Sequence, residues 1–305
     1  MKVTAVTPRG YCKGVVRAIN IVKKATKEVK PPIYILGMIV HNEYIVNALK
    51  NMGAITIEDS QKTRLELLDE VDEGTIIITA HGAGDNVKAK AEAKHLAIID
   101  ASCPDVIKTH ELIKKYLDEG KDILYIGKNH HPEAEGALAI SDRVHLIQSI
   151  DDIEKIDPNG DYVMTNQTTM SLYDVYTICE KAKQCLPHVT IAKETCNATK
   201  IRQEAIASLD DDIDLVIIVG DPRSNNTKKL ASIAKTQAHK PTQMIESIND
   251  LDLTWLNEAH HVAVSSGAST PTSLTNQIIR FIEQYDPDDV TTHQKPAIQY
   301  EDILR

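Results

Sequence analysis

The chain alternates short apolar runs with longer stretches in which apolar residues recur at helical spacing. The apolar runs have strand length, and they include the segments KVTAVT, IYILG, HLAIID, DILYIG and LVIIVG. After the first run, Val15, Ile19 and Val22 lie on one face of an expected helix. Strands that alternate with helices are typical of parallel sheets, so the predicted fold class is α/β.

The same series of elements occurs three times along the chain. Three of the five cysteines, Cys12, Cys103 and Cys196, are 91 and 93 residues apart, and each stands between a strand-like run and a helical pattern. After each cysteine come a second strand, a polar loop that opens another helix, and a later strand. The later strands end in the segments TAHGAG, TNQTTMS and SSGASTP. A fixed period indicates structural repeats, so the sequence predicts three α/β lobes.

The strand before Cys12 opens the chain, whereas the equivalent strands of the other copies close the preceding lobe. We therefore expect the N-terminal strand to complete the third lobe. The three pseudo-threefold-related lobes would then form a ring with the cysteine turns at its centre. The predicted boundaries are residues 14–102, 103–195, 196–280 together with 1–13, and a C-terminal tail at 281–305 that has no counterpart in the repeat.

Composition narrows the range of functions. The 305 residues are 42% hydrophobic and 26% charged, and they hold no apolar run of about 18 residues, so no membrane span is expected. The net charge of -10 argues against general nucleic-acid binding. The first residues lack the apolar core of a signal peptide, so we expect a cytoplasmic protein. Cysteines in such a compartment favour metal or redox roles over disulfides.

The three repeated cysteines are candidate metal ligands. They stand where a strand ends and a helix begins, and a helix N-terminus favours the thiolate form that binds metal. The CxxC pairs typical of zinc sites do not occur in the sequence. Three thiolates around a threefold axis match three corners of a 4Fe–4S cluster and leave one iron open for a substrate oxygen. Cys179 and Cys185 lie in a helical stretch outside the repeat, and we expect them to serve packing or to lie at the surface.

Polar residues recur in the loops of the three copies. His41 and His131 lie 29 and 28 residues after their cysteines, and Asn226 lies 30 residues after Cys196, with Ser224 close by. The next loop of each copy supplies His81, Thr168 and Ser269. Hydrogen-bond donors of this kind, together with helix N-termini, suit a phosphate or diphosphate.

Glu133 is a candidate proton donor. It follows His131 by two residues, at the start of the helix expected from HPEAEG. A carboxyl group in a water-poor pocket can hold or pass a proton. The alternative is a favourable charge in the first turn of a helix, and Glu135 fits that alternative better.

The chain resembles the 4-hydroxy-3-methylbut-2-enyl diphosphate reductase (IspH/LytB) family. The resemblance runs in order from residue 1 to about residue 280, and its segments are PRGYCKGVVRAI, LGMIVHNEYIV, TAHGAG, DASCPDVIKTH, HHPEAEG, TNQTTMS, ETCNATKIRQ, SNNTKKL and SSGASTP. It implies a trefoil-like α/β fold of three lobes around a central 4Fe–4S cluster. It also implies the last step of the non-mevalonate isoprenoid pathway, in which two electrons and two protons remove the allylic hydroxyl as water. The implied products are isopentenyl and dimethylallyl diphosphate.

The resemblance also implies roles for individual residues. Cys12, Cys103 and Cys196 match the cluster ligands, and Glu133, with Thr168 and His131, matches the catalytic set that relays protons. The diphosphate and substrate set comprises His41, His81, His131, Gln167, Thr168, Ser224, Asn225, Asn226 and Ser269. Asn225 stands where many members carry a second serine, and TAHGAG replaces the commoner SAHGVS. The implied partners are an allylic diphosphate and an electron donor such as ferredoxin or flavodoxin, and we expect a monomer.

Two other functions are compatible with a three-cysteine cluster. One is a non-redox iron–sulfur lyase of the quinolinate synthase type, which would need arginine and serine donors for carboxylates rather than three histidines. Only a reductase would stall without a reductant. The other is an iron–sulfur sensor or electron carrier, which predicts no tight binding of a diphosphate.

Overall fold

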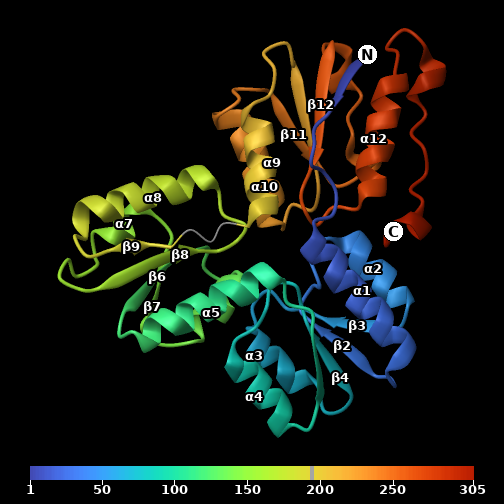
Figure 1. Cartoon of the computed structure of the whole chain (residues 1–305). Coiled ribbons are helices and arrows are strands. Elements are labelled where there is room, and N and C mark those ends of the chain that lie inside the picture. Colours follow the sequence, from blue (N-terminus) through green and yellow to red (C-terminus); the bar gives the residue numbers. More distant parts are fainter. Residues whose placement is uncertain (193–195) are drawn as a thin grey trace. The chain divides into compact units, whose positions relative to one another are not determined.

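The computed structural model describes residues 1–192 and 196–305, and these residues form three four-stranded parallel sheets (Figure 1). The described chain divides into two compact units. The first unit holds residues 1–15, 41–48 and 197–305, and the second holds residues 16–40 and 49–196. Glu194 and Thr195 of the ETCNATKIRQ segment lie outside the described residues. The lobe boundaries expected from the repeat stay a prediction.

The sheet of the first unit includes the first strand of the chain. Its strands are β1 (Lys2–Ala5), β10 (Leu215–Val219), β11 (Thr242–Ile245) and β12 (His261–Ser266). Their order is β1-β12-β10-β11, and Lys2 pairs with His261 in the parallel ladder of β1 and β12. The N-terminal strand therefore completes the sheet of the third repeat, as the sequence predicts.

Helices of the first unit cover this sheet. They are α9 (Asn197–Ala207), α10 (Asn225–Thr236), α11 (Thr254–Asn257) and α12 (Thr272–Gln284), with short 3-10 turns η2 (Ile248–Asp250), η3 (Val290–His293) and η4 (Tyr300–Asp302). Strand β10 is buried along its whole length. A strand that is apolar at every position is typical of a parallel sheet that is covered on both faces.

The second unit contains the sheet of the first repeat. Its strands are β2 (Ile33–Leu36), β3 (Ala54–Ile57), β4 (Thr75–Ile78) and β5 (Ala97–Asp100), in the order β3-β2-β4-β5. The helices of this part of the chain are α1 (Lys13–Glu28), α2 (Glu43–Asn51), α3 (Arg64–Leu67) and α4 (Asp85–Ala93), with the 3-10 turn η1 (Leu68–Glu70). Helices α1 and α2 each contribute residues to both units.

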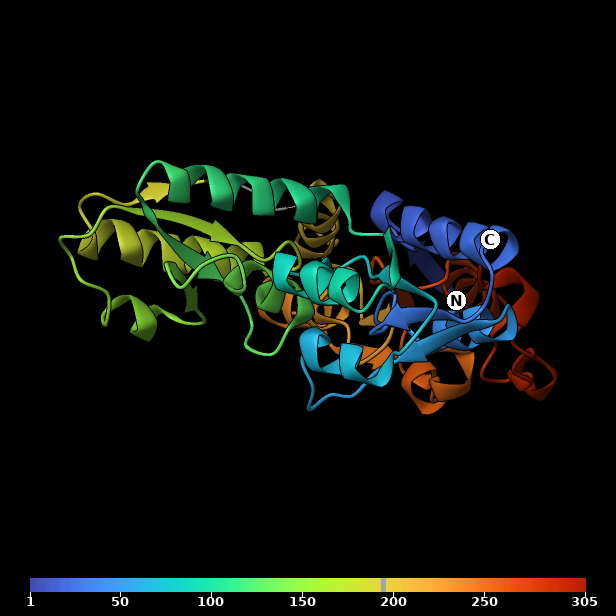
Figure 2. The same cartoon turned by 90° about the horizontal axis from the view of Figure 1, so that it is seen from below.

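The second unit also contains the sheet of the second repeat. Its strands are β6 (Asp122–Ile126), β7 (Val144–Ile147), β8 (Tyr162–Asn166) and β9 (Thr190–Ile191), in the order β7-β6-β8-β9. Its helices are α5 (Pro104–Asp118), α6 (Pro132–Leu138), α7 (Ile150–Ile153) and α8 (Leu172–Cys185). Ile123 and Tyr125 of β6 pack with α5 and α6, whereas Leu124 and Ile126 pack with α8 on the other face. Figure 1 shows α5 and α8 beside the strands of this sheet, and Figure 2 shows the same elements from below.

All three sheets have the same order of strands. In each, the strand that leads to a repeated cysteine lies at one edge, beside the last strand of its repeat, and the first strand of the repeat is central. The predicted α/β class with three repeated sheets is confirmed. Among the described residues, no helix combines the length and apolarity that a membrane crossing needs.

The tail that the repeat leaves out is packed against the first unit. Helix α12 continues to Gln284, so the irregular tail begins later than residue 281. The side chain of Ile298 packs against the core of the first sheet, and Ile303 is fully buried. The rings of Tyr285 and His293 stack with their centroids 4.9 Å apart. The sequence offers no periodic pattern here because these contacts are made by single residues.

The backbone after β1 requires glycine at position 10. Gly10 has a φ of +71°, and an added Cβ would lie 2.3 Å from Thr272 Oγ1. Its amide donates a hydrogen bond of 2.7 Å to Ser266 Oγ, so the turn is held close to the end of β12. The glycine thus serves the approach of this turn to α12. Gly14, on the other side of Cys12, is the second residue of α1.

We predict that Gly10→Ala destabilises the protein by about 3 kcal/mol, because left-handed strain and a steric clash add together. Gly53→Ala is the matched control, because Gly53 has a φ of +95° but nothing within 4 Å of an added Cβ. We expect the control to lose only about 1 kcal/mol. Urea unfolding of both variants measures the difference, and equal losses would show that Thr272 does not constrain the turn.

Candidate functional site

Two of the repeated cysteines each make a backbone hydrogen bond at the equivalent position of their turns. The amide of Cys12 donates to the carbonyl of Ala268, at 3.1 Å, and the amide of Cys103 donates to the carbonyl of Ala80, at 2.9 Å. Each acceptor lies two residues beyond the strand that neighbours the cysteine's own strand in the sheet. The two turns therefore repeat not only the order of strands but also the same backbone hydrogen bond.

The thiol groups of the three cysteines suit a metal cluster. Cys103 is the N-cap of α5, and Cys12 and Cys196 directly precede α1 and α9. The amide of Val15 lies 3.5 Å from Cys12 Sγ, as a donor to sulfur. All three side chains are partly exposed, so a ligand can reach them. Sulfur donors at helix N-termini are favourable for thiolates and therefore fit an iron–sulfur cluster. Joint ligation by the three cysteines stays a prediction.

The carboxyl group of Glu133 is buried and is held by Thr168. Glu133 lies in the first turn of α6 and is 2% exposed. The amide of Thr168 donates to one carboxyl oxygen at 2.5 Å, and its hydroxyl donates to the other at 3.1 Å. Burial raises the pKa of Glu133 to about 7, against the lowering effect of these hydrogen bonds. A carboxyl with this pKa can both hold and release a proton near neutral pH.

Tyr125 lies beside Glu133, and the sequence gives no signal for it. It is fully buried within β6, and the Glu133 carboxyl is close enough to interact with its hydroxyl. Burial, and then the charge of Glu133, raise the pKa of Tyr125 well above its ordinary value. Its phenol therefore keeps its proton beside the acid. Within the apolar run DILYI, Tyr125 reads as an ordinary core residue.

His131 and His81 lie close together in the second unit. His131 is the N-cap of α6, and its Nδ1 accepts a hydrogen bond from the amide of Glu133 at 3.2 Å. A neutral His131 therefore carries its proton on Nε2. The rings of His81 and His131 meet edge to face, with centroids 5.6 Å apart. This arrangement provides imidazole donors next to the buried acid.

The first unit brings together His41, Ser224 and Ser269. The hydroxyl of Ser269 lies 3.2 Å from the carbonyl oxygen of His41 and 3.4 Å from Ser224 Oγ. Ser224 is the N-cap of α10 and accepts a hydrogen bond from the amide of Thr227. Three loops that are distant in the sequence thus meet at one helix N-terminus, where backbone amides favour an anion.

Asn225 and Asn226 form the first turn of α10. Both are buried, with exposed fractions of 6% and 4%. Neither the amide nitrogen nor the amide oxygen of Asn226 has a hydrogen-bond partner among residues 1–192 and 196–305. A buried amide without partners costs free energy, so a polar ligand beside Asn226 would stabilise the site.

The side chain of Gln167 makes hydrogen bonds to residues of two neighbouring loops. Its Oε1 accepts a hydrogen bond from the amide of Lys128 at 3.0 Å, and its Nε2 donates to Thr169 Oγ1 at 2.8 Å. The side chain therefore connects the loop after β6 with the loop after β8. This geometry favours a role in the shape of the site, whereas direct contact of Gln167 with a substrate stays a prediction.

Arg223 connects the loop before α10 with the start of α2. Its guanidinium bonds Asp221 at 2.6 Å and Glu43 at 2.8 Å. Burial raises the pKa of Asp221, but the hydrogen bonds and charge of Arg223 and, more weakly, His41 outweigh it and leave this pKa below its ordinary value. The ion pair between Arg223 and Glu43 joins segments 180 residues apart, so local sequence patterns do not reveal it.

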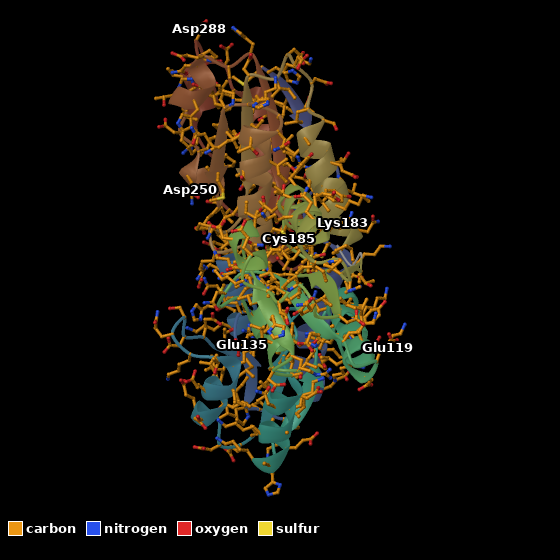
Figure 3. The ribbon with its side chains drawn as sticks, turned by 90° about the vertical axis from the view of Figure 1, so that its left-hand side faces the viewer. Glu119, Glu135, Lys183, Cys185, Asp250 and Asp288 are labelled. Carbon is orange, nitrogen blue, oxygen red and sulfur yellow. The ribbon has the colours of Figure 1, made fainter. Side chains whose placement is uncertain are left out.

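Cys179, Cys185 and Glu135, for which the sequence predicts packing or structural roles, make contacts of that kind. Cys179 packs in the core beside Met164, and Cys185, labelled in Figure 3, contacts the same core at the end of α8. Glu135, also labelled there, accepts a hydrogen bond of 2.8 Å from the amide of Arg64. Its carboxylate also lies 3.9 Å from the Arg64 guanidinium. Glu135 is therefore a structural acid, unlike Glu133 two residues before it.

A comparison with protein families matches residues 3–283 to the family described as LytB protein. Two relatives are named 4-hydroxy-3-methylbut-2-enyl diphosphate reductase. The protein of Geobacillus kaustophilus is 47% identical over 299 residues, which are 97% of this chain and 94% of the relative. The protein of Exiguobacterium sibiricum is 44% identical over 311 residues, which are 100% of this chain and 98% of the relative.

Two solved structures similar to this chain also carry the name of a hydroxymethylbutenyl diphosphate reductase. The E-1-hydroxy-2-methyl-but-2-enyl-4-diphosphate reductase of Plasmodium falciparum superimposes with a TM-score of 0.87 and 33% identity, over 94% of this chain and 88% of that one. A second structure is titled (E)-4-hydroxy-3-methyl-but-2-enyl diphosphate reductase, the terminal enzyme of the non-mevalonate pathway. It has a TM-score of 0.66 and 29% identity, over 93% of this chain and 100% of that one.

The raised pKa of Glu133 predicts a pH-dependent contribution to stability. The unfolded carboxyl loses its proton near its ordinary pKa of 4.5, whereas the folded one keeps it to about pH 7. The contribution is therefore complete below pH 4.5 and is lost as the pH rises to about 7. We expect Glu133→Gln to lack this loss and Glu135→Gln to keep it. Urea unfolding at pH 5, 6, 7 and 8 tests this, and a wild-type pH dependence in Glu133→Gln would contradict it.

Proposed function

Since this chain belongs to the LytB family, whose curated relatives are named 4-hydroxy-3-methylbut-2-enyl diphosphate reductase, we infer that it catalyses the same reduction. It is an oxidoreductase of isoprenoid biosynthesis that acts at the terminal step of the non-mevalonate pathway. The substrate loses its allylic hydroxyl as water, with two electrons and two protons consumed. The products are isopentenyl and dimethylallyl diphosphate. The observation that carries this conclusion is identity of 44–47% over nearly the full length of these relatives.

The cofactor in this proposal is a 4Fe–4S cluster held by Cys12, Cys103 and Cys196. The equivalent turns of Cys12 and Cys103, and the three sulfur donors at helix N-termini, support the assignment. When bound, such a cluster supplies electrons and one iron that no cysteine of the chain ligates. The electrons come from a donor such as a ferredoxin or flavodoxin. Monomeric state and cytoplasmic location stay predictions.

In this proposal the diphosphate is bound by the donors that the family resemblance implies. They include His41, His81, His131, Ser224, Asn225, Asn226 and Ser269. The amide of Asn226, which has no hydrogen-bond partner in the described part of the chain, and the N-terminus of α10 support a polar anionic ligand in the first unit. His131 offers its Nε2 proton, because Nδ1 already accepts from Glu133. His131 and Ser224 are already held as helix N-caps, so they lose little conformational freedom when the ligand binds.

Glu133 supplies the proton to the departing hydroxyl. Its carboxyl is neutral below about pH 7, and Thr168 holds both of its oxygens. The hydroxyl of Thr168 can pass on the proton while the amide keeps the carboxyl in place. The fully buried Tyr125 lies beside the acid and helps to keep water away from it.

We predict that Cys103→Ser loses the brown absorbance near 400 nm that is roughly typical of iron–sulfur proteins, together with its iron. A serine hydroxyl is a poor replacement for a thiolate at a cluster. Cys185→Ser is the control, because Cys185 packs in the core of β6–β9. Iron content and absorbance of anaerobically purified proteins measure the effect. Full iron and activity in Cys103→Ser would disprove the ligand assignment.

We predict that Glu133→Gln binds the diphosphate with an unchanged KM but has a kcat about 10²–10⁴-fold lower, the usual loss on removal of a general acid. In the wild type, kcat/KM should fall as the pH rises through about 7, because the acid must carry its proton. Glu135→Gln should retain both the rate and this pH profile. Anaerobic turnover with a chemical reductant measures these values, and near-normal turnover of Glu133→Gln would remove it from the mechanism.

A further inference from the structure

The tail that follows α12 lies outside the family match, which ends at residue 283. It spans a cavity of about 810 Å³ that it lines together with α12, so it is not packed along its whole length. Figure 1 shows it, in red, beside α12. Three contacts hold its middle part. The carbonyl of Ala297 accepts from Gln277, Lys295 donates to the carbonyl of Asn249, and Ile298 packs on the core.

The end of the tail reaches the turn that carries Cys12. The hydroxyl of Tyr11 donates a hydrogen bond to the backbone carbonyl of Ile303. The side chain of Ile303 is fully buried, so this carbonyl is fixed in position. Tyr11 is the residue immediately before Cys12. The tail therefore contacts the turn at the position next to a candidate cluster ligand.

The turn that carries Cys12 is held by contacts from several parts of the first unit. Gly10 donates to Ser266, and its carbonyl accepts from Arg202 at 2.8 Å. Cys12 donates to the carbonyl of Ala268. These contacts fix the backbone on both sides of Tyr11, and the Tyr11 side chain is fixed by the tail.

The turn of Cys103 has an equivalent support from outside its strand. Ser102, which precedes Cys103, accepts a hydrogen bond of 2.8 Å at its carbonyl from Arg17 of α1. Both turns thus have a brace at the residue before the cysteine. A brace at this position restricts the direction in which the thiol points, because one peptide unit separates the two side chains.

We propose that residues 285–305 act as a strap that positions Cys12 for the iron–sulfur cluster, with Tyr11 as the positioning residue that transmits the contact from Ile303. The proposal rests on the assignment of Cys12 as a ligand in the proposed function. It gives the tail a role that neither the repeat nor the family match contains. The strap acts on retention of the cluster and leaves binding of the diphosphate unaffected.

The test measures the rate at which anaerobic holoprotein releases iron to an excess of a ferrous chelator. Tyr11→Phe removes the hydroxyl and keeps the ring. We expect iron release about five- to tenfold faster, the factor that corresponds to one lost hydrogen bond, and an unchanged KM for the diphosphate. Ile303→Ala, which removes the anchor of the strap, should act in the same direction.

Tyr285→Phe is the matched control. The hydroxyl of Tyr285 donates to Asn257 at 2.8 Å, in the same unit but on another part of the tail. We expect this variant to lose a similar amount of stability toward urea and to release iron at the wild-type rate. A wild-type rate in Tyr11→Phe, or equal acceleration in Tyr285→Phe, would overturn the strap.

Cys12→Ser separates this proposal from the proposed function. If Cys12→Ser loses its iron while Tyr11→Phe releases iron as the wild type does, only the strap is wrong. If Cys12→Ser keeps its full iron content, Cys12 is not a ligand, and the ligand assignment and the strap are both wrong.

Discussion

Parallel pairing of the strands is the constraint on which the rest of this protein depends. Because all strands of a parallel sheet run in one direction, the loops that follow them emerge at the same edge. Here each sheet orders its strands identically, and three adjacent strands lead to a cysteine, to a loop with histidine or asparagine, and to a loop with histidine, threonine or serine. The hydrogen bonds from Cys12 to Ala268 and from Cys103 to Ala80 tie neighbouring loops together. The chemistry of the site thus follows from the topology of the sheets.

The buried pair of Glu133 and Thr168 shows how this scaffold sets a proton affinity. An acid with no water around it would bind its proton too tightly to act as a donor. Two hydrogen bonds from Thr168 oppose that effect, and the pKa remains at about 7. The two residues lie 35 positions apart, Glu133 in the first turn of α6 after β6 and Thr168 in the loop after the adjacent strand β8. A shift between these two strands would separate the Glu133 carboxyl from both donors of Thr168 without any change of residue.

The sequence predicts the parts of this protein that repeat. The three sheets and the N-terminal strand beside β12 follow from spacing and apolar pattern. The raised pKa of Glu133 does not, because burial depends on the complete fold. Tyr125 is hidden in an apolar strand, and the pair of Arg223 and Glu43 connects distant loops. The contact of Tyr11 with Ile303 is equally invisible, since a single anchoring residue in a polar tail creates no period. Gln167 joins the loop after β6 to the loop after β8 through hydrogen bonds to Lys128 and Thr169, and its motif does not indicate this contact.

The central claim is that the three cysteines of the repeat hold one 4Fe–4S cluster and leave a single iron for the substrate. Mössbauer spectroscopy of anaerobic protein loaded with iron-57, with and without 4-hydroxy-3-methylbut-2-enyl diphosphate, tests this claim most directly. The account predicts that the diphosphate changes the signal of one iron in four and leaves the other three unchanged. A spectrum that the diphosphate does not alter, or one in which all four irons change equally, would contradict it.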